Sequence, residues 1–313
     1  MGLSITPSAD RSHILTEQNN PRSRALDALS VAECIALIHE EDAAVIDALR
    51  QARASIVAFT QAICPGFVAG GRLIYFGAGT SGRLGVLDAS EAPPTFQVPP
   101  GRIVGIIAGG DGALRLSSEG KEDDAQGVRA ELERLNLTPR DAVLGIAAGG
   151  TTPYVVGGMS VAKMLCAGVT TGMLTCTPIE RPSDADHLIV LATGAEVLTG
   201  STRMKAGSAT KMALNAISTT LMVQSGRVYE NLMVDVRASN AKLVDRAARI
   251  VITLTGIDRQ RAISLLGEAG GSVKVAVVMH TLGLPAAAAE TRLELAAGRL
   301  RVALASAKPP LAQ

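Results

Sequence analysis

Five short runs of apolar residues punctuate the middle of the chain, and each is followed by a segment with helical or loop character. Hydrophobicity in these runs is continuous rather than alternating, which indicates strands that are covered on both faces. Parallel sheets flanked by helices bury their strands in this way. The pattern predicts an α/β fold with a doubly wound, five-stranded parallel sheet, whose strands span residues 73–76, 103–108, 142–147, 171–176 and 187–192.

Helical periodicity precedes the predicted sheet. Ser30 and Glu33 have the spacing of a capping box, so a helix should begin there. A second helix is expected from about Asp42 until Pro65-Gly66 interrupts the pattern. The prolines between Pro93 and Pro100 predict a loop before the second strand.

Helices are also expected after the fifth strand. The stretch 202–224 has no proline and carries apolar residues at helical spacing, and another helix is predicted over 238–255. Beyond Gly256, shorter helical pieces alternate with glycine and proline as far as Pro309-Pro310. We therefore predict an N-terminal helical segment (1–50), a sheet domain (51–255) and a small helical C-terminal region (256–313).

Composition narrows the class of ligand. Lys and Arg together number 30 against 29 for Asp and Glu, and only 2% of residues are aromatic. The chain therefore lacks both the basic surface and the stacking residues that nucleic-acid binding requires. The four cysteines and four histidines have no zinc-site spacing, so we predict no metal site.

Two segments bear on the location of the protein. The first residues contain no apolar stretch of the length that a secretion signal needs, which predicts a cytoplasmic protein. The uncharged stretch 142–162 has the length of a membrane span, but Gly149, Gly150 and Pro153 interrupt it. Strand, loop and helix are expected there, and no membrane contact is predicted.

A glycine-rich loop, G-A-G-T-S-G from Gly77 to Gly82, follows the first predicted strand. Ligands of such sheets bind beyond the carboxyl ends of the strands, where helix N-termini present free amides to anions. The string also fits a dinucleotide-binding fold. That fold needs an acidic residue at the end of the second strand, about 20 positions after the glycine loop, to bind the ribose, and this chain has none there. A monophosphate site is favoured over a dinucleotide site or a turn without ligand, with contacts from Gly79, Thr80, Ser81 and Gly82.

The third predicted strand ends in a second loop of this kind. It reads Gly149-Gly150-Thr151-Thr152-Pro153 and offers two hydroxyls and free amides before the next helix. Taken alone, the loop is as consistent with an ordinary turn as with a ligand contact. Because the two loops follow neighbouring strands, we expect Gly150, Thr151 and Thr152 to share the phosphate with the first loop.

Longer strings extend beyond the two loops. They are 77–91, 93–96, 196–207 with Lys211, Thr16-Glu17, Asn20-Pro21, 228–235, Asn240 and Lys242-Leu243. Together they resemble the N-acetylmuramic acid 6-phosphate etherases, bacterial lyases built on a sugar isomerase (SIS) domain, and the resemblance runs almost end to end. It implies an αβα sandwich, a homodimer and a small three-helix, ubiquitin-associated-like C-terminus, of which 273–279 is the clearest piece. The glucokinase regulatory protein shares much of the pattern.

The resemblance implies a reaction with two acid/base groups. Cleaving the lactyl ether at carbon 3 requires removal of the hydrogen at carbon 2, which is acidic beside the aldehyde of the open-chain sugar, and protonation of the departing oxygen. Water then adds to the unsaturated intermediate. The catalytic pair matches Glu91, which closes D-A-S-E, and Glu122, with Glu119 one helical turn earlier as the alternative for the second role.

Two further features qualify the predicted site. Ser201 and Thr202 lie near a helix start and are expected to contact the substrate, whereas Lys205 and Lys211 are at least as consistent with exposed cations at a helix cap. The second loop of the etherases usually reads A-A-S-G, but this chain has Gly149 in place of the serine. One hydroxyl donor to the phosphate is therefore missing.

The resemblance implies an enzyme that converts N-acetylmuramic acid 6-phosphate and water into N-acetylglucosamine 6-phosphate and D-lactate, without a metal or a redox cofactor. The partner is then a small phosphosugar. The alternative is a noncatalytic sugar-phosphate sensor like the glucokinase regulatory protein, although that protein has two such domains and is much longer. An aldose–ketose isomerase would use the same fold, but the strings 88–91 and 196–211 argue against it.

Overall fold

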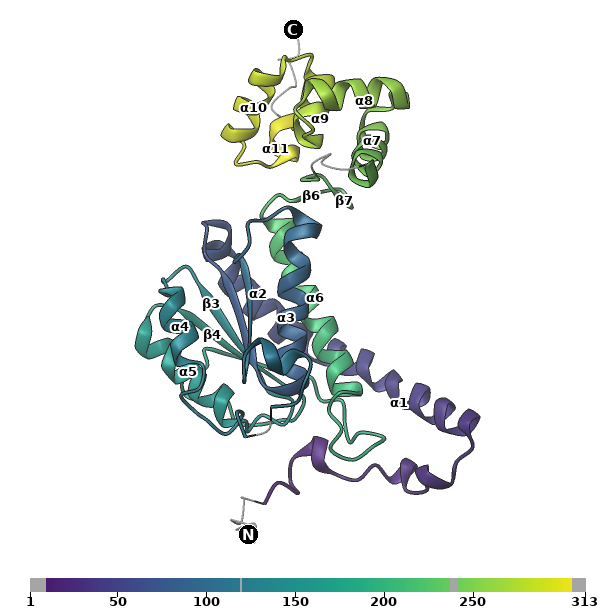
Figure 1. Cartoon of the computed structure of the whole chain (residues 1–313), viewed down its shortest axis with the longest axis vertical. Coiled ribbons are helices and arrows are strands. Elements are labelled where there is room, and N and C mark those ends of the chain that lie inside the picture. Colours follow the sequence, from purple (N-terminus) through teal and green to yellow (C-terminus); the bar gives the residue numbers. More distant parts are fainter. Residues whose placement is uncertain (1–9, 119, 237–240, 306–313) are drawn as a thin grey trace. The chain divides into compact units, whose positions relative to one another are not determined.

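The computed structural model describes residues 10–118, 120–236 and 241–305, which form two compact units (Figure 1). The first unit comprises Met1–Ser90 and Gly101–Ile217, and the second comprises Glu91–Pro100 and Ser218–Gln313. Several positions named above lie outside the described residues: residues 1–9, Glu119, the predicted helix start at Ala238, Asn240 and Pro309-Pro310. The division at residues 50 and 255 stays a prediction.

The first unit is built on the predicted five-stranded parallel sheet. Its order is β2-β1-β3-β4-β5, and β1 pairs in register with both β2 and β3. Figure 1 shows α4 and α5 on one side of the sheet and α2, α3 and α6 on the other, which confirms the doubly wound fold. The strands are β1 (Leu73–Gly77), β2 (Ile103–Ile107), β3 (Ala142–Ile146), β4 (Thr170–Thr175) and β5 (His187–Val190), and the helices are α2 (Arg53–Val68), α3 (Gly79–Phe96), α4 (Arg129–Leu135), α5 (Pro153–Leu165) and α6 (Lys205–Gln224).

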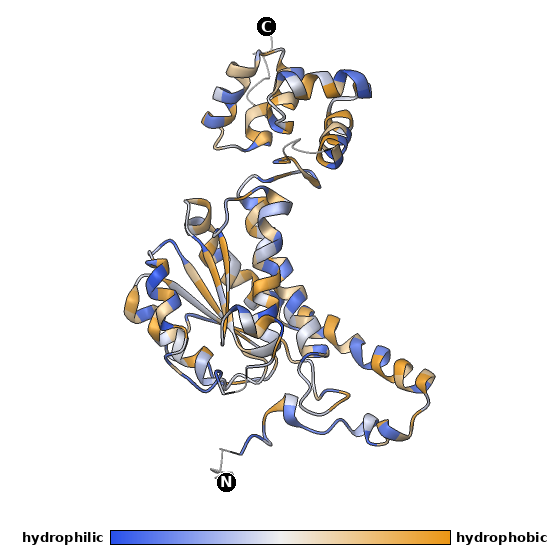
Figure 2. Ribbon diagram, in the orientation of Figure 1, coloured by the Kyte–Doolittle hydropathy of each residue, from blue (hydrophilic) through white to orange (hydrophobic). Residues whose placement is uncertain are grey.

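The strands are hydrophobic along their length because both of their faces are covered (Figure 2). Two glycines set how closely the helices approach. A Cβ atom at Gly105 of β2 would lie 2.5 Å from Cα of Val86 in α3, and one at Gly145 of β3 would lie 2.7 Å from Cγ1 of Val155 in α5. Only glycine allows these contacts, so α3 at Val86 and the first turn of α5 at Val155 pack closely against the sheet.

Three predicted helix boundaries were wrong. Helix α1 (Val31–Gln51) begins with the expected capping box of Ser30 and Glu33, but it continues through Asp42 because no glycine or proline breaks it. Helix α2 continues past Pro65, and α3 contains Pro93 and Pro94 and ends only at Phe96. Proline removes one backbone donor, and a helix near its end can lose that bond without ending there.

Short 3₁₀ turns complete the first unit. They are η1 (Leu15–Glu17), η2 (Pro21–Ser23), η3 (Leu26–Ala28) and η4 (Asp111–Leu114). The first three lie before α1, in a segment where the sequence predicted no specific element. They bring the beginning of the chain to the sheet domain.

The second unit is mostly helical. A small hairpin of β6 (Val228–Tyr229) and β7 (Leu232–Met233) precedes its helices, and its core centres on α9. Four described helices follow residue 256, where the resemblance predicted three. The helices are α7 (Ala241–Thr255), α8 (Arg259–Glu268), α9 (Val273–Leu282), α10 (Ala286–Leu295) and α11 (Leu300–Ala305).

Within the described residues, no helix taken singly is long and apolar enough to cross a membrane, and one sharply bent pair, α9 with α10, meets the criterion only when the two are joined. The stretch 142–162 is divided between β3, a loop and α5, as predicted.

Candidate functional site at the carboxyl edge of the sheet

The first glycine loop lies at the carboxyl end of β1, directly against β3. A Cβ atom at Gly77 would lie 2.8 Å from the carbonyl oxygen of Ile146, and one at Gly82 would lie 2.5 Å from that of Gly77. Gly79 has a φ of +52° and begins α3, so Thr80 and Ser81 occupy its first turn. The first turn of a helix has backbone amides without intrahelical partners, which is what an anion site requires. The amide of Gly82 is not among them, because it donates to the carbonyl oxygen of Ala78 (3.2 Å).

The second loop lies at the carboxyl end of the neighbouring strand β3. Gly150 has a φ of +77°, and a Cβ atom there would lie 2.8 Å from Cγ2 of Ile179, so only glycine fits. Thr152 precedes α5 and makes no side-chain cap, and Thr151 is exposed. The structure therefore brings the two predicted loops to one edge of the sheet.

A third segment, after β5, meets the first loop. A Cβ atom at Gly207 would lie 3.3 Å from the carbonyl oxygen of Thr202 and 3.5 Å from Cγ2 of Thr80. Ser201 and Thr202 form the turn that leads into α6, and both are half-buried. The predicted substrate contacts thus lie in the first residues of α3 and in the segments that precede α5 and α6.

The two predicted catalytic glutamates have different positions. The carbonyl oxygen of Glu122 accepts a hydrogen bond of 2.9 Å from the amide of Tyr154, so Glu122 lies beside the first turn of α5 and the second loop. Glu91 lies on α3, ten residues after Ser81, which corresponds to roughly 15 Å along the helix axis. Both side chains are exposed.

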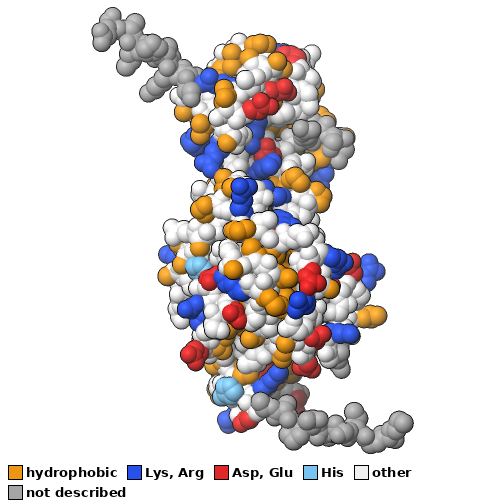
Figure 3. Space-filling view, turned by 90° about the vertical axis from the view of Figure 1, so that its left-hand side faces the viewer, with side chains coloured by type: hydrophobic (Ala, Val, Ile, Leu, Met, Phe, Trp, Pro, Cys, Tyr) orange, Lys and Arg blue, Asp and Glu red, His pale blue; other side chains and the backbone are white. Residues whose placement is uncertain are grey.

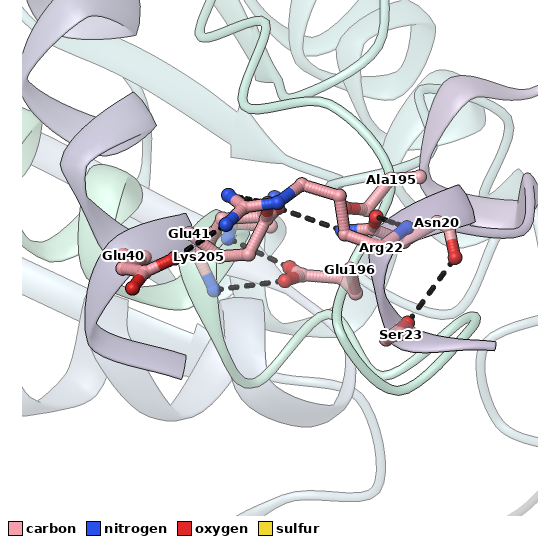
Figure 4. A network of polar contacts seen from close by, with 9 residues as sticks. Asn20, Arg22, Ser23, Glu40, Glu41, Ala195, Glu196 and Lys205 are labelled. Carbon is pink, nitrogen blue, oxygen red and sulfur yellow. Dashed lines mark hydrogen bonds and ion pairs between the residues drawn. The ribbon is translucent and has the colours of Figure 1, made fainter. Parts of the chain in front are cut away.

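A buried polar network, missed by the sequence analysis, supports the third segment (Figure 4). Glu196 is fully buried and accepts hydrogen bonds from the backbone amides of Lys205 (3.1 Å) and Ala206 (2.9 Å), at the start of α6. The ammonium group of Lys205 lies 2.7 Å from Glu41 of α1. Lys205 is 3% exposed, so the interpretation as an exposed cation was wrong.

The same network holds the beginning of the chain. The side-chain amide of Asn20 donates to Glu41 (2.7 Å) and to the carbonyl oxygen of Ala195 (3.3 Å), and Arg22 pairs with Glu41 (2.9 Å) and with Glu40. Burial alone would raise the pKa of Glu41, but hydrogen bonds from Lys205 and Asn20 outweigh it and hold the pKa below its ordinary value. Glu41 is therefore an ionised link between α1, α6 and the first residues.

The Glu196 carboxyl should make stability depend on pH. Burial raises its pKa above the ordinary 4.5, although backbone hydrogen bonds and Lys205 oppose the shift. A group whose pKa is higher in the folded state contributes stability that is complete below the unfolded pKa and is lost as the pH rises through the folded pKa. The free energy of unfolding of the native chain, minus that of Glu196→Gln, should therefore fall as the pH rises from about 4. Urea titrations at a series of pH values measure this difference. Glu41 is present in both proteins, so its own contribution to the pH dependence largely cancels. A difference that grows with pH would contradict it.

Replacement of Gly149 by serine should strengthen substrate binding. A Cβ atom there would lie 3.6 Å from Cγ2 of Ile14 and 3.8 Å from Oγ1 of Thr16, which are ordinary contacts, so a serine fits. A hydrogen bond to a charged group contributes about 1.5 to 3 kcal/mol, so the KM for the phosphosugar should fall about tenfold or more. Gly150→Ser, one position on, is the matched control and should damage the loop. An unchanged or higher KM in Gly149→Ser would show that the loop does not need this hydroxyl.

Surface charge, possible metal ligands and cysteine reactivity provide no further candidate site among the described residues. On the face shown in Figure 3, acidic and basic side chains of the described residues are interspersed. Among the residues that the structure describes, no group of three or more His, Cys, Asp or Glu side chains could hold a metal ion. Burial raises the pKa of the Cys176 thiol to about 12, which makes it a poor nucleophile.

Known proteins are similar in sequence to this chain over nearly its whole length. The N-acetylmuramic acid 6-phosphate etherase of Synechococcus sp. (strain CC9605) is 49% identical over 99% of this chain and 98% of its own. That of Parasynechococcus marenigrum (strain WH8102) is 52% identical over 98% and 96%, respectively. The family of the glucokinase regulatory protein N-terminal SIS domain matches residues 55–163. Among solved structures, the Vibrio vulnificus NanR protein complexed with ManNAc-6P has a TM-score of 0.40 and 16% identity, over 74% of this chain and 76% of that one.

Proposed function

This chain belongs to the N-acetylmuramic acid 6-phosphate etherase family, and we propose that it converts N-acetylmuramic acid 6-phosphate and water into N-acetylglucosamine 6-phosphate and D-lactate. The observation that carries the proposal is the identity of about half of all residues over nearly the full length of both chains. The setting would be cell-wall sugar recycling in the cytoplasm, with residues 51–255 as the catalytic domain.

The loops at the carboxyl edge would hold the phosphate. The first turn of α3 offers backbone amides and two hydroxyls, and the second loop lies beside it on the neighbouring strand. A dianion at this edge gains from the amides and from the N-terminal dipoles of α3 and α5. The residues that we assign to substrate binding are Gly79, Thr80, Ser81, Gly82, Gly150, Thr151, Thr152, Ser201 and Thr202.

Two carboxyl groups would carry the chemistry. One removes the hydrogen at carbon 2, and the other protonates the lactate oxygen as its bond to carbon 3 breaks. Water then adds at carbon 3, and a proton returns to carbon 2. We assign protonation of the lactate oxygen to Glu91 and removal of the hydrogen to Glu122, which lies beside the second loop.

The position of Glu91 favours a homodimer with shared active sites. A phosphate at the N-terminus of α3 would be more than about 15 Å from Glu91 of the same chain, measured along the helix. Only five bonds, roughly 6 to 7 Å, separate the phosphorus from carbon 3 of the sugar. We therefore assign Glu91 to the active site of a second copy, where contact with that copy would also bury a carboxyl that is exposed here.

Helix α1 offers a surface for that second copy. Val31 is 78% exposed, Ile35 49% and Ile46 42%, so one side of the helix carries large apolar side chains in solvent. Figure 2 shows hydrophobic residues at intervals along α1, which extends away from the sheet. Burial of such side chains between copies would stabilise a dimer.

An assay of the purified protein tests the proposed function directly. Incubation with N-acetylmuramic acid 6-phosphate should release D-lactate and N-acetylglucosamine 6-phosphate in equal amounts. Binding of the phosphosugar without lactate release would contradict the proposal and support a sensor instead.

A further inference from the structure

Residues 14–20, here called the N-terminal strap, lie along the same edge of the sheet as the phosphate loops. Three contacts tie the strap to the segment after β5. The amide of Gly200 donates to the carbonyl oxygen of Thr16 (3.2 Å), Thr199 donates to the side chain of Asn19 (2.9 Å), and Asn20 donates to the carbonyl oxygen of Ala195 (3.3 Å). The strap therefore belongs to the walls of the candidate site.

The other side of the strap faces the second loop. Ile14 and Thr16 are the residues that a side chain at Gly149 would touch. Thr16 is fully buried, and its hydroxyl has no hydrogen-bond partner among the described residues. The strap thus lies between Gly149, which precedes one group of assigned substrate contacts, and Gly200, which precedes another.

Glu17 is the charged side chain that the strap brings to this place. Its Oε2 lies 3.2 Å from the position of a Cβ atom at Gly200, directly before Ser201. The backbone of Glu17 is fixed, because its amide donates to the carbonyl oxygen of Ile14 (2.9 Å) within η1. The side chain is exposed, and the described residues provide it with no hydrogen bond or ion pair.

The charge of the Glu17 carboxylate limits which ligand groups it can bind beside an anion site. It repels a phosphate, and it can only accept hydrogen bonds while ionised. A sugar phosphate also carries neutral donors, namely the hydroxyl groups and the acetamido N–H. A carboxylate at the rim of the phosphate loops can bind these groups while it disfavours anions that lack them.

We propose that Glu17 is a specificity-determining residue that accepts hydrogen bonds from the neutral donors of the sugar and so selects a phosphosugar over a bare phosphate. The inference rests on the proposed function for the nature of the substrate. It concerns binding and assigns Glu17 no part in proton transfer.

Calorimetric titration with two ligands tests the proposal. Glu17→Ala should weaken the binding of N-acetylglucosamine 6-phosphate about tenfold to hundredfold, because a hydrogen bond to a charged group is lost. The affinity for inorganic phosphate should stay the same or increase, since a repulsive charge is removed. Glu17→Gln, which keeps one acceptor oxygen, should show a smaller loss for the phosphosugar. Gln18→Ala, an exposed neighbour in the strap, is the matched control and should bind both ligands as the native chain does.

The outcomes separate this inference from the proposed function. Equal weakening of both ligands, or no change in either, would overturn the role of Glu17. If the native chain binds the phosphosugar but releases no D-lactate, the proposed reaction fails while the selectivity of Glu17 can still be measured. If the native chain does not bind the phosphosugar at all, both proposals fail. Thermal unfolding should be unchanged in Glu17→Ala, because the side chain is exposed.

Discussion

Replacement of Glu91 by alanine should abolish the release of D-lactate and leave the exchange of the carbon 2 hydrogen intact. If Glu91 is the acid that protonates the departing oxygen, its loss blocks ether cleavage but not the earlier removal of the hydrogen by Glu122. Loss of a general acid typically slows a reaction about 10² to 10⁴-fold. Proton NMR in deuterated water follows the carbon 2 signal, and an enzymatic assay follows D-lactate in the same sample.

Two further variants make the result specific. Glu122→Ala should lose both the exchange and the cleavage, because the hydrogen must leave before the ether can break. Ser90→Ala is the control for changes to α3, since its hydroxyl donates only to the carbonyl oxygen of Leu87 among the described residues, and it should keep both activities. Loss of exchange in Glu91→Ala would refute this division of roles.

The sheet was predictable because its central strands β1 and β3 are buried on both faces. Leu73, Ile74, Tyr75 and Phe76 of β1 are all fully buried, so the strand has no polar position that would obscure its apolar run. Parallel pairing then places the ends of all five strands at one edge, and this is why two glycine loops distant in sequence could be assigned to one site.

Helix boundaries were less predictable, because the sequence signals for them are local and packing can override them. Pro65 and Pro93 are strong signals for the end of a helix, yet α2 and α3 continue past them. Where a helix packs along a sheet, burial of its apolar side can outweigh the loss of one hydrogen bond. Helix α1 likewise continues through Asp42, where the sequence predicted that a second helix would begin.

The rest of the site depends on long-range contacts that leave no local pattern. Lys205 and Glu41 are 164 positions apart, and nothing near either residue indicates that they form a buried pair. The dipeptide Thr16-Glu17 was part of the family resemblance, but it does not form a motif with a chemical role of its own. Its place beside Gly149 and Gly200 becomes visible only when the chain is folded.

A heterodimer of two inactive variants should recover about half of the native activity, as one of its two sites would be intact. If Glu91 of one copy serves the site that contains Glu122 of the other, combining Glu91→Ala with Glu122→Ala places both defects in one site and leaves the other site whole. Each variant alone would be inactive as a homodimer. Co-expression with two different affinity tags, followed by sequential purification, isolates the heterodimer for the D-lactate assay.

The reciprocal heterodimer decides between the two arrangements. A native copy paired with the double variant Glu91→Ala/Glu122→Ala should be inactive if the sites are shared, because each site then receives one defective residue. If both glutamates act within one copy, the results reverse: this pair keeps about half of the activity, and the pair of single variants has none. The separation of Glu91 from Ser81, ten residues or roughly 15 Å along the axis of α3, predicts the shared arrangement.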